Sequence, residues 1–216
     1  MRVEAAPIVS DRPGRTVRAL CEHPLLDVTW SRYEHGQPGP EPHVHHEHVD
    51  AFYIVEGELQ FQVGPDVEPV RAPAGTFVLV PPHVVHGFDN VSDSTTRWLN
   101  FHAPSTGFIP YLRGERDGFD SFDPPADGGR PAGDATIAHP DARGELGRES
   151  RFAATEVELA PGADHELAAE GVQCAFVLAG SVEPGGGPGT WICGPATLRN
   201  SGPGPARLLH VGAPAP

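Results

Sequence analysis

Histidines gather in one part of this 216-residue chain, where seven of the twelve lie between His35 and His86. Such clustering is typical of a metal site. Within residues 39–57 (GPEPHVHHEHVDAFYIVEG), His43 and His45 are separated by one residue. On an extended strand both imidazoles therefore project from the same face, and two nitrogen ligands converge without distortion of the backbone.

A carboxylate and a third imidazole can complete this set. Asp50 lies just beyond an expected turn, so an antiparallel hairpin would bring its carboxylate beside His43 and His45. His86 would come from a distant strand. Three imidazoles and one carboxylate suit one divalent transition-metal ion (Fe, Mn, Ni, Cu or Zn) and are too rich in nitrogen for calcium or magnesium. On a six-coordinate ion, positions would stay open for water, substrate oxygens or dioxygen.

Other polar residues near this set carry weaker expectations. Asp50 itself could be a metal ligand or a catalytic base beside the metal. For His46 and His48 we expect solvent exposure or a surface ion pair. His83 could form part of a pocket wall behind the ligands, or only a turn. His102 and Tyr53 could face either the cavity or the back of the sheet, because strand parity does not decide without knowledge of bulges. The sequence therefore does not decide whether the side chains of His83, His102 and Tyr53 face the site.

The elements that position these residues are predicted to be strands. Residues 58–63 (ELQFQV) alternate polar and apolar with period two, and residues 28–33, 52–55, 76–80 and 98–102 are further β-rich runs. The 26 glycines and 25 prolines are too many for a helical bundle. We therefore predict an all-β fold. The expected barrel core comprises Phe52, Ile54, Phe61, Phe77, Phe88, Trp98 and Phe101.

An internal repeat organises the chain. Residues 74–90 and 97–104 (AGTFVLVPPHVVHGFDN, RWLNFHAP) recur as residues 188–200 and 207–214 (PGTWICGPATLRN, RLLHVGAP), and Gly57 matches Gly180. A gap after Pro195 removes the counterpart of the segment with His83 and His86. Residues 107–113 could form a short helix, and residues 117–134 are predicted to be an irregular connector. We therefore expect a metal-binding domain at 1–104, a connector at 105–149 and a degenerate second copy at 150–216.

These motifs resemble those of the cupin superfamily. The first cupin motif, Gly-x5-His-x-His-x3,4-Glu-x6-Gly, is matched with two departures: aspartate replaces glutamate, and Gly36 stands one residue too early. The second motif, Gly-x5-Pro-x-Gly-x2-His-x3-Asn, is matched with His83 in place of its last glycine. The matching residues are His43, His45, Asp50 and Gly57 for the first motif, and Gly75, Pro81, His86 and Asn90 for the second.

The resemblance implies tandem double-stranded β-helix (jelly-roll) barrels, of which the second is reduced. It places the metal in the mouth of the first barrel, on His43, His45, Asp50 and His86. In the second copy, Glu166 and Ala168, or His165, occupy the region of the missing histidine pair, and Gln173 replaces the carboxylate. We expect no metal there. The pattern is similar to that of bacterial bicupins described as quercetinase-like, and we expect a homodimer.

Three functions remain open. The first is a metal-dependent dioxygenase-like enzyme that acts on a small aromatic or enolisable oxygenated substrate, with Asp50 accepting a proton. The second is a non-redox isomerase, epimerase or cyclase of a natural-product pathway, in which the metal acts as a Lewis acid. The third is a cupin that binds a small molecule without turnover, because cupins host enzymes, storage proteins and regulators alike.

Composition excludes several other classes. The net charge of -14 disfavours nucleic acid and anionic membrane as partners. All 15 basic residues are arginines, so Schiff-base chemistry on a lysine is excluded.

The cysteines Cys21, Cys174 and Cys193 are far apart and odd in number, which favours buried free thiols in a reducing compartment. No apolar leader or membrane-spanning run is present in the sequence, and we expect a cytoplasmic protein.

Overall fold

The computed structural model describes residues 1–64 and 68–215. It contains two compact units: a first unit, Ile8–Asp141, and a second unit formed by Met1–Pro7 with Ala142–Pro216. Strands dominate both units, which confirms the all-β prediction. The domain boundaries expected at residues 104 and 149 stay a prediction. The structure adds that a strand at Thr136–Ala138 pairs within the first unit.

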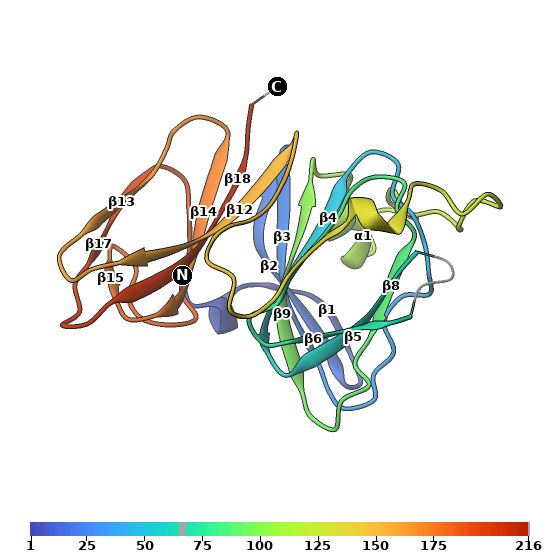
Figure 1. Ribbon diagram of the computed structural model, residues 1–216, viewed down its shortest axis with the longest axis horizontal. Helices are drawn as coiled ribbons and strands as arrows, with labels where there is room; N and C mark the ends of the chain where they lie inside the picture. The colour runs from blue at the N-terminus through green and yellow to red at the C-terminus, as the bar shows by residue number, and fades with distance from the viewer. Residues whose placement is uncertain (65–67, 216) are drawn as a thin grey trace. The chain divides into compact units, whose positions relative to one another are not determined.

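Two antiparallel sheets form the first unit (Figure 1). A seven-stranded sheet has the order β1-β2-β3-β9-β4-β7-β10, and a three-stranded sheet has the order β6-β5-β8. The strands are β1 (Ile8–Arg12), β2 (Arg15–His23), β3 (Leu26–Tyr33), β4 (Val49–Glu56), β5 (Glu58–Val63), β6 (Val70–Pro73), β7 (Phe77–Val80), β8 (His86–Asp89), β9 (Thr96–Ala103) and β10 (Thr136–Ala138).

A hydrophobic core fills the space between these sheets. Burial alternates along β5, as the period-two pattern predicted. Phe88 packs against the core from β8, while Phe77 and Phe101 are buried outside it. The core cluster contains Phe52, Ile54, Leu59, Phe61, Val63, Ala72, Val78, Val80, Val84 and Trp98. The apolar side chains of β4 that share a face with Asp50 thus anchor this strand to the core.

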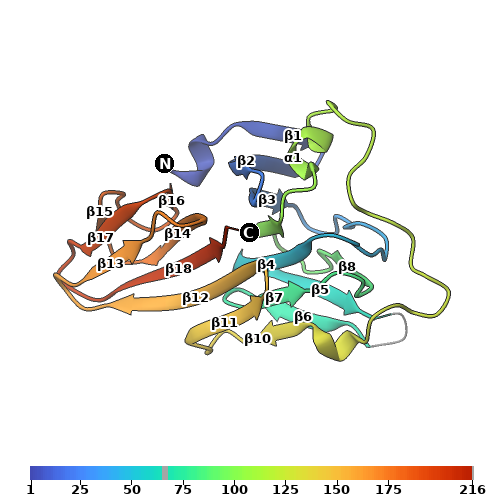
Figure 2. The same ribbon diagram turned by 90° about the horizontal axis from the view of Figure 1, so that it is seen from above.

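Helices are few and short. The α-helix α1 (Phe108–Leu112) lies where the sequence predicted one, and η1 (Val3–Ala5) and η2 (Ala132–Asp134) are 3-10 turns. Within the part of the chain that the structure describes, no helix has the length and apolar character needed to cross a bilayer. After α1 the chain follows a long irregular path to β10 (Figure 2).

The second unit repeats the strand order of the first. Its larger sheet, β11-β12-β18-β14-β16, contains the series β12-β18-β14-β16, which corresponds to β3-β9-β4-β7, and a smaller sheet has the order β13-β17-β15. The strands are β11 (Gly144–Glu149), β12 (Phe152–Leu159), β13 (Asp164–Leu167), β14 (Val172–Ala179), β15 (Val182–Glu183), β16 (Trp191–Cys193), β17 (Ala196–Asn200) and β18 (Ala206–Ala213).

Details of the turns also match between the units. Gly57 and Gly180 both adopt left-handed backbone angles, with φ of 77° and 75°. Asn90 and Asn200 each accept a hydrogen bond from the backbone two residues later, and each donates to the carbonyl of the last residue of a strand, Tyr33 of β3 and Leu159 of β12. The predicted gap is visible, since β17 follows β16 after only two residues. The second unit is therefore a shortened copy of the first.

The expectation of three free thiols was wrong for the second unit. Cys174 on β14 and Cys193 on β16 are register partners, and they form a disulfide. Strand pairing places their Cα atoms 4.1 Å apart, although 19 positions separate them in the sequence. The spacing of the cysteines along the chain therefore gave no indication of the bond.

Candidate metal centre

The four residues predicted to bind metal lie together in the first unit. His43, His45, Asp50 and His86 each present a nitrogen or oxygen atom, and these atoms lie within 4.8 Å of one another. Backbone pairing explains the meeting: the amide of His43 donates to the carbonyl of His86 at 2.9 Å, and the reverse bond has the same length. The loop before β4 is thereby joined to the start of β8.

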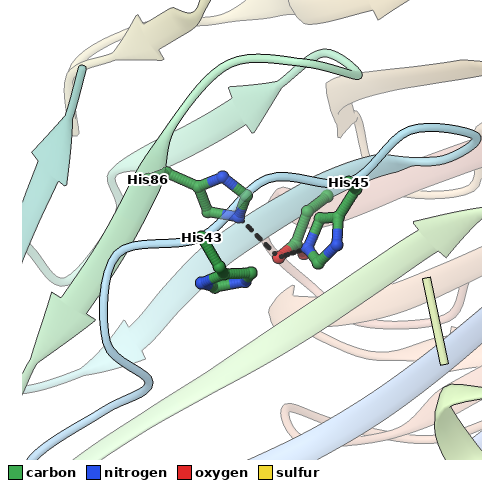
Figure 3. Close-up of side chains that lie close together, drawn as sticks. His43, His45 and His86 are labelled. Carbon is green, nitrogen blue, oxygen red and sulfur yellow. Dashed lines mark hydrogen bonds and ion pairs between the residues drawn. The ribbon is translucent and has the colours of Figure 1, made fainter. Parts of the chain in front are cut away.

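The three imidazoles are held in one tautomer. In each ring Nδ1 lies within hydrogen-bonding distance of a backbone carbonyl, which can only accept, so Nδ1 carries the proton and Nε2 keeps its lone pair. The three rings face a common space (Figure 3). The pairs are His43 with Glu41 (2.8 Å), His86 with Val84 (3.0 Å) and His45 with Asp120. Metal-binding histidines are oriented in this way.

The carboxylate of Asp50 reaches the three imidazoles, although the aspartate side chain is shorter than that of the glutamate in the cupin motif. Its Oδ2 lies 3.2 Å from Nε2 of His86 and 3.4 Å from Nε2 of His45. Its Oδ1 accepts hydrogen bonds from His102 Nε2 at 3.2 Å and from Asn100 Nδ2 at 2.5 Å. The replacement of glutamate by aspartate therefore does not withdraw the carboxylate from the imidazoles.

The charges and lone pairs of His43, His45, Asp50 and His86 favour the binding of a cation. Burial, followed by the nearby His86 and His45, lowers the pKa of His43 to about 4, so this ring is neutral at pH 7. Burial would raise the pKa of Asp50, but the pKa lies well below its ordinary value, chiefly because of the nearby His102, which donates a hydrogen bond to Oδ1. Nε2 of His45 is buried without a hydrogen-bond partner. Lone pairs and a carboxylate that face one another away from water fit a divalent transition-metal ion.

A second buried pair lies behind the ligands and corrects the prediction for His48. This side chain is fully buried rather than exposed, and its Nδ1 donates to Oδ2 of Asp120 at 2.8 Å. Asp120 also accepts from the backbone amides of His46 and Glu47 at 2.9 and 2.7 Å. Burial, which lowers the pKa of His48 to about 3, outweighs the hydrogen bond to Asp120. The His48 ring stacks on His45, with centroids 3.9 Å apart.

Comparison with known proteins places this site in a family. The model of the cupin domain matches residues 29–102. The first unit contains a cupin domain. A search of curated proteins found no match to the chain.

Solved structures share the fold across nearly the whole chain at low sequence identity. The bacterial pirin YhhW of Escherichia coli, in complex with nickel(II), has a TM-score of 0.68 at 12% identity and covers 100% of this chain and 98% of its own. The oxalate decarboxylase of Lactobacillus farciminis, in complex with formate, has a TM-score of 0.64 at 13% identity. The match covers 99% of this chain and 85% of the decarboxylase. The putative glyoxylate-induced protein of Pseudomonas aeruginosa has a TM-score of 0.61 at 14% identity. The match covers 94% of this chain and 83% of that protein.

Two residues of the cupin domain that strand parity left undecided are now placed. His102 lies directly opposite Asp50 in the β4–β9 pairing, with its side chain on the carboxylate. Tyr53 stands three positions further along β4, and successive side chains alternate, so it is buried on the other face from Asp50. His102 therefore belongs to the site and Tyr53 does not.

His83 does not stand behind the ligands, contrary to one of the two expectations for it. Its side chain is exposed and its φ is 68°, the left-handed conformation for which the cupin motif has glycine. Its backbone amide donates to the carbonyl of His45 at 2.7 Å. His46 is exposed, as expected, and its ring lies 5.1 Å from that of His83. His83 thus contacts the ligand loop through its backbone amide and, at the surface, through its ring.

A cavity of about 360 Å³ opens onto the metal centre of the cupin domain. His43, His45 and Asp50 form part of its wall. Its volume lies in the range of small-molecule binding sites. The remaining lining residues are Ser10, Arg12, Arg15, Val17, Ser31, Tyr33, Gly39, Pro40, Phe88, Trp98, Asn100, His102, Phe108, Tyr111, Leu112, Phe119 and Ser121. An ion at the centre would be open to a molecule bound in this cavity.

The second unit has different residues at the corresponding place. Gln173 stands seven residues before Gly180, as Asp50 stands seven before Gly57. Gln173 accepts a hydrogen bond from Nε2 of His210 at 2.8 Å, and Nδ1 of His210 lies 3.1 Å from Nε2 of His165. Gln173 thus stands at the position of Asp50, and polar contacts connect it to His210 and His165.

Proposed function

We propose that the cupin domain binds one divalent transition-metal ion through His43, His45, Asp50 and His86 and acts as an oxygenase on a small oxygenated substrate that is aromatic or enolisable. The observation that carries this proposal is the position of three residues of the ligand set, His43, His45 and Asp50, in the wall of the cavity. The nickel(II) complex of the E. coli pirin, which has the same fold, supports a metal in a site of this kind.

The chain supplies binding, orientation and a proton acceptor. A redox-active ion held here would lower the pKa of a bound hydroxyl group and make electron transfer to dioxygen possible. Asp50 would receive the proton of that hydroxyl group from a substrate bound beside it, while His102 and Asn100 hold its other oxygen. Trp98, Phe108 and Phe119 line the cavity and reduce its content of water.

Metal analysis and oxygen uptake test the proposal together. Protein purified without a nickel column should contain about one ion per chain. Replacement of His43, His45 and His86 by alanine should abolish metal binding, whereas His46→Ala, in the same loop but exposed, should leave it unchanged. Oxygen consumption is then measured with flavonols and diketones.

Two results would count against this function. Unaltered metal content in the triple variant would remove the ligand assignment. Stoichiometric metal with no oxygen uptake for any substrate would favour Lewis-acid chemistry or simple binding instead. We also propose a homodimer, and light scattering of the purified protein tests its oligomeric state.

A further inference from the structure

The cavity beside the metal centre carries positive charge, although the chain as a whole has a net charge of -14. Arg12 on β1 and Arg15 on β2 both line it. Among the lining residues that the structure describes, Asp50 is the one carboxylate. A divalent ion at the centre would more than neutralise this carboxylate. The cavity therefore attracts an anion even though the surrounding protein repels one.

Arg15 is held in a fixed position. It is half-buried, and its Nε donates to Oε1 of Gln37 at 2.9 Å. Its guanidinium carbon lies 5.1 Å from the centre of the Tyr33 ring, and Tyr33 packs edge-on against Trp98 with centroids 4.7 Å apart. A guanidinium that is already immobilised loses little entropy when it binds a carboxylate. Arg12 is exposed and adds charge at the rim.

Aromatic side chains form another part of the wall. Phe108 lies 5.1 Å from Phe119, and Phe119 lies 5.1 Å from Tyr111, measured between ring centroids. Trp98 and Phe88 line the same cavity, with centroids 5.4 Å apart. Such surfaces favour a flat apolar body in the ligand.

We propose that the ligand of this cavity is an aromatic carboxylate, with its ring between the aromatic side chains and its carboxylate on Arg15, assisted by Arg12. The orientation of its remaining oxygen substituents toward His43, His45 and Asp50 rests on the function proposed above. The carboxylate contact does not, because Arg15 belongs to neither the ligand set nor its hydrogen-bonding partners. Binding to Arg15 therefore persists without metal.

Two probes that differ only by a carboxylate test this assignment: 3,4-dihydroxybenzoate and catechol. Their affinities are measured by calorimetry for metal-free and zinc-loaded protein. We expect the carboxylate to bind about tenfold more tightly in both forms. In Arg15→Gln this preference should fall close to unity, and Arg15→Lys should retain part of it. Arg18→Gln, on the same strand but outside the cavity lining, is the matched control and should preserve the preference.

The outcomes separate this inference from the proposed oxygenase. A preference that survives in Arg15→Gln means that another group, such as Arg12 or the metal, binds the carboxylate, and the assignment is wrong. Failure of dihydroxybenzoate to bind wild-type protein at millimolar concentration also overturns it. If the metal-free protein shows the arginine-dependent preference while the loaded protein consumes no oxygen, the oxygenase proposal fails and this one stands.

Discussion

His102 donates from Nε2 to Oδ1 of Asp50 across 3.2 Å, from the position directly opposite it on the neighbouring strand. Asn100 holds the same oxygen from the next position on that face of β9. Because Oδ1 is occupied from one side, Oδ2 is left facing His45 and His86. The register of β4 and β9 thus aims the carboxylate at the metal centre.

Replacement of His102 should weaken metal binding without removing a ligand. In His102→Gln we expect the metal affinity to fall about 10- to 100-fold, because partners that orient ligands typically contribute this much. Titration with zinc, monitored by calorimetry, measures the change. His46→Gln is the matched control, since His46 is an exposed histidine of the ligand loop. An affinity equal to that of wild type would show that Asp50 needs no support from His102.

Asp120 should contribute to stability. Asp120→Ala removes the acceptor for His48 and for the backbone amides of His46 and Glu47. Donors left unpaired near the interior cost free energy, and we expect the free energy of unfolding to fall by about 2 kcal/mol. Urea denaturation measures it. Asp117→Ala, at an exposed position of the same segment, should change it by less than about 0.5 kcal/mol. Equal effects of the two substitutions would argue against this role.

The backbone conformation at His83 should determine which side chains this position tolerates. His83 has a φ of 68°, which is costly for residues branched at Cβ. His83→Val should therefore lower the free energy of unfolding by more than about 1 kcal/mol, whereas His83→Gly should be tolerated. Thermal denaturation of both variants checks this order. Since the side chain is exposed, loss of contacts does not explain a difference between them.

His210 should make stability depend on pH. Burial, followed by the neighbouring His165, lowers its pKa to about 4, whereas an unfolded histidine has a pKa of about 6.5. As pH falls below about 6.5, the unfolded chain takes up the proton first, so the free energy of unfolding decreases until about pH 4. This slope is at most about 1.4 kcal/mol per pH unit, and partial exposure reduces it.

The variant His210→Gln isolates this contribution. Urea midpoints between about pH 7 and pH 5 should shift less in His210→Gln than in wild type. His139→Gln is the control, because His139 is exposed and should leave the shift unchanged. If all three proteins lose stability in parallel, the dependence comes from other groups.

The ligand set could be predicted because strand parity and the spacings of two motifs connect its members. His43 and His45 share a face by parity, and the motif spacings connect them to Asp50 and His86. The repeated segments likewise predicted the duplicated strand order. In each case the relationship depends on strand parity, on the fixed spacing of a motif or on a repeat. Residues that share one face of a strand, or that belong to a motif of fixed spacing, leave a trace in the sequence.

Asp120, His48 and the disulfide leave no such trace. Asp120 comes from an irregular segment 72 positions beyond His48, and it reaches the ligand loop through pairing of Val44 with Phe122. No periodicity predicts the path of a segment rich in glycine, proline and aspartate. The sequence therefore predicted an exposed position for His48. Cys174 and Cys193 met only because β14 and β16 lie in register.

The imidazoles of the metal centre take their orientation from main-chain oxygens of Glu41, Val84 and Asp120. Every amino acid carries this oxygen, so substitution at Glu41 or Val84 leaves the acceptor in place. Insertion or deletion of a single residue in either loop would instead swing the oxygen away from its ring. Over evolutionary time, such a centre tolerates drift in the identity of its neighbours and is lost through changes in loop length.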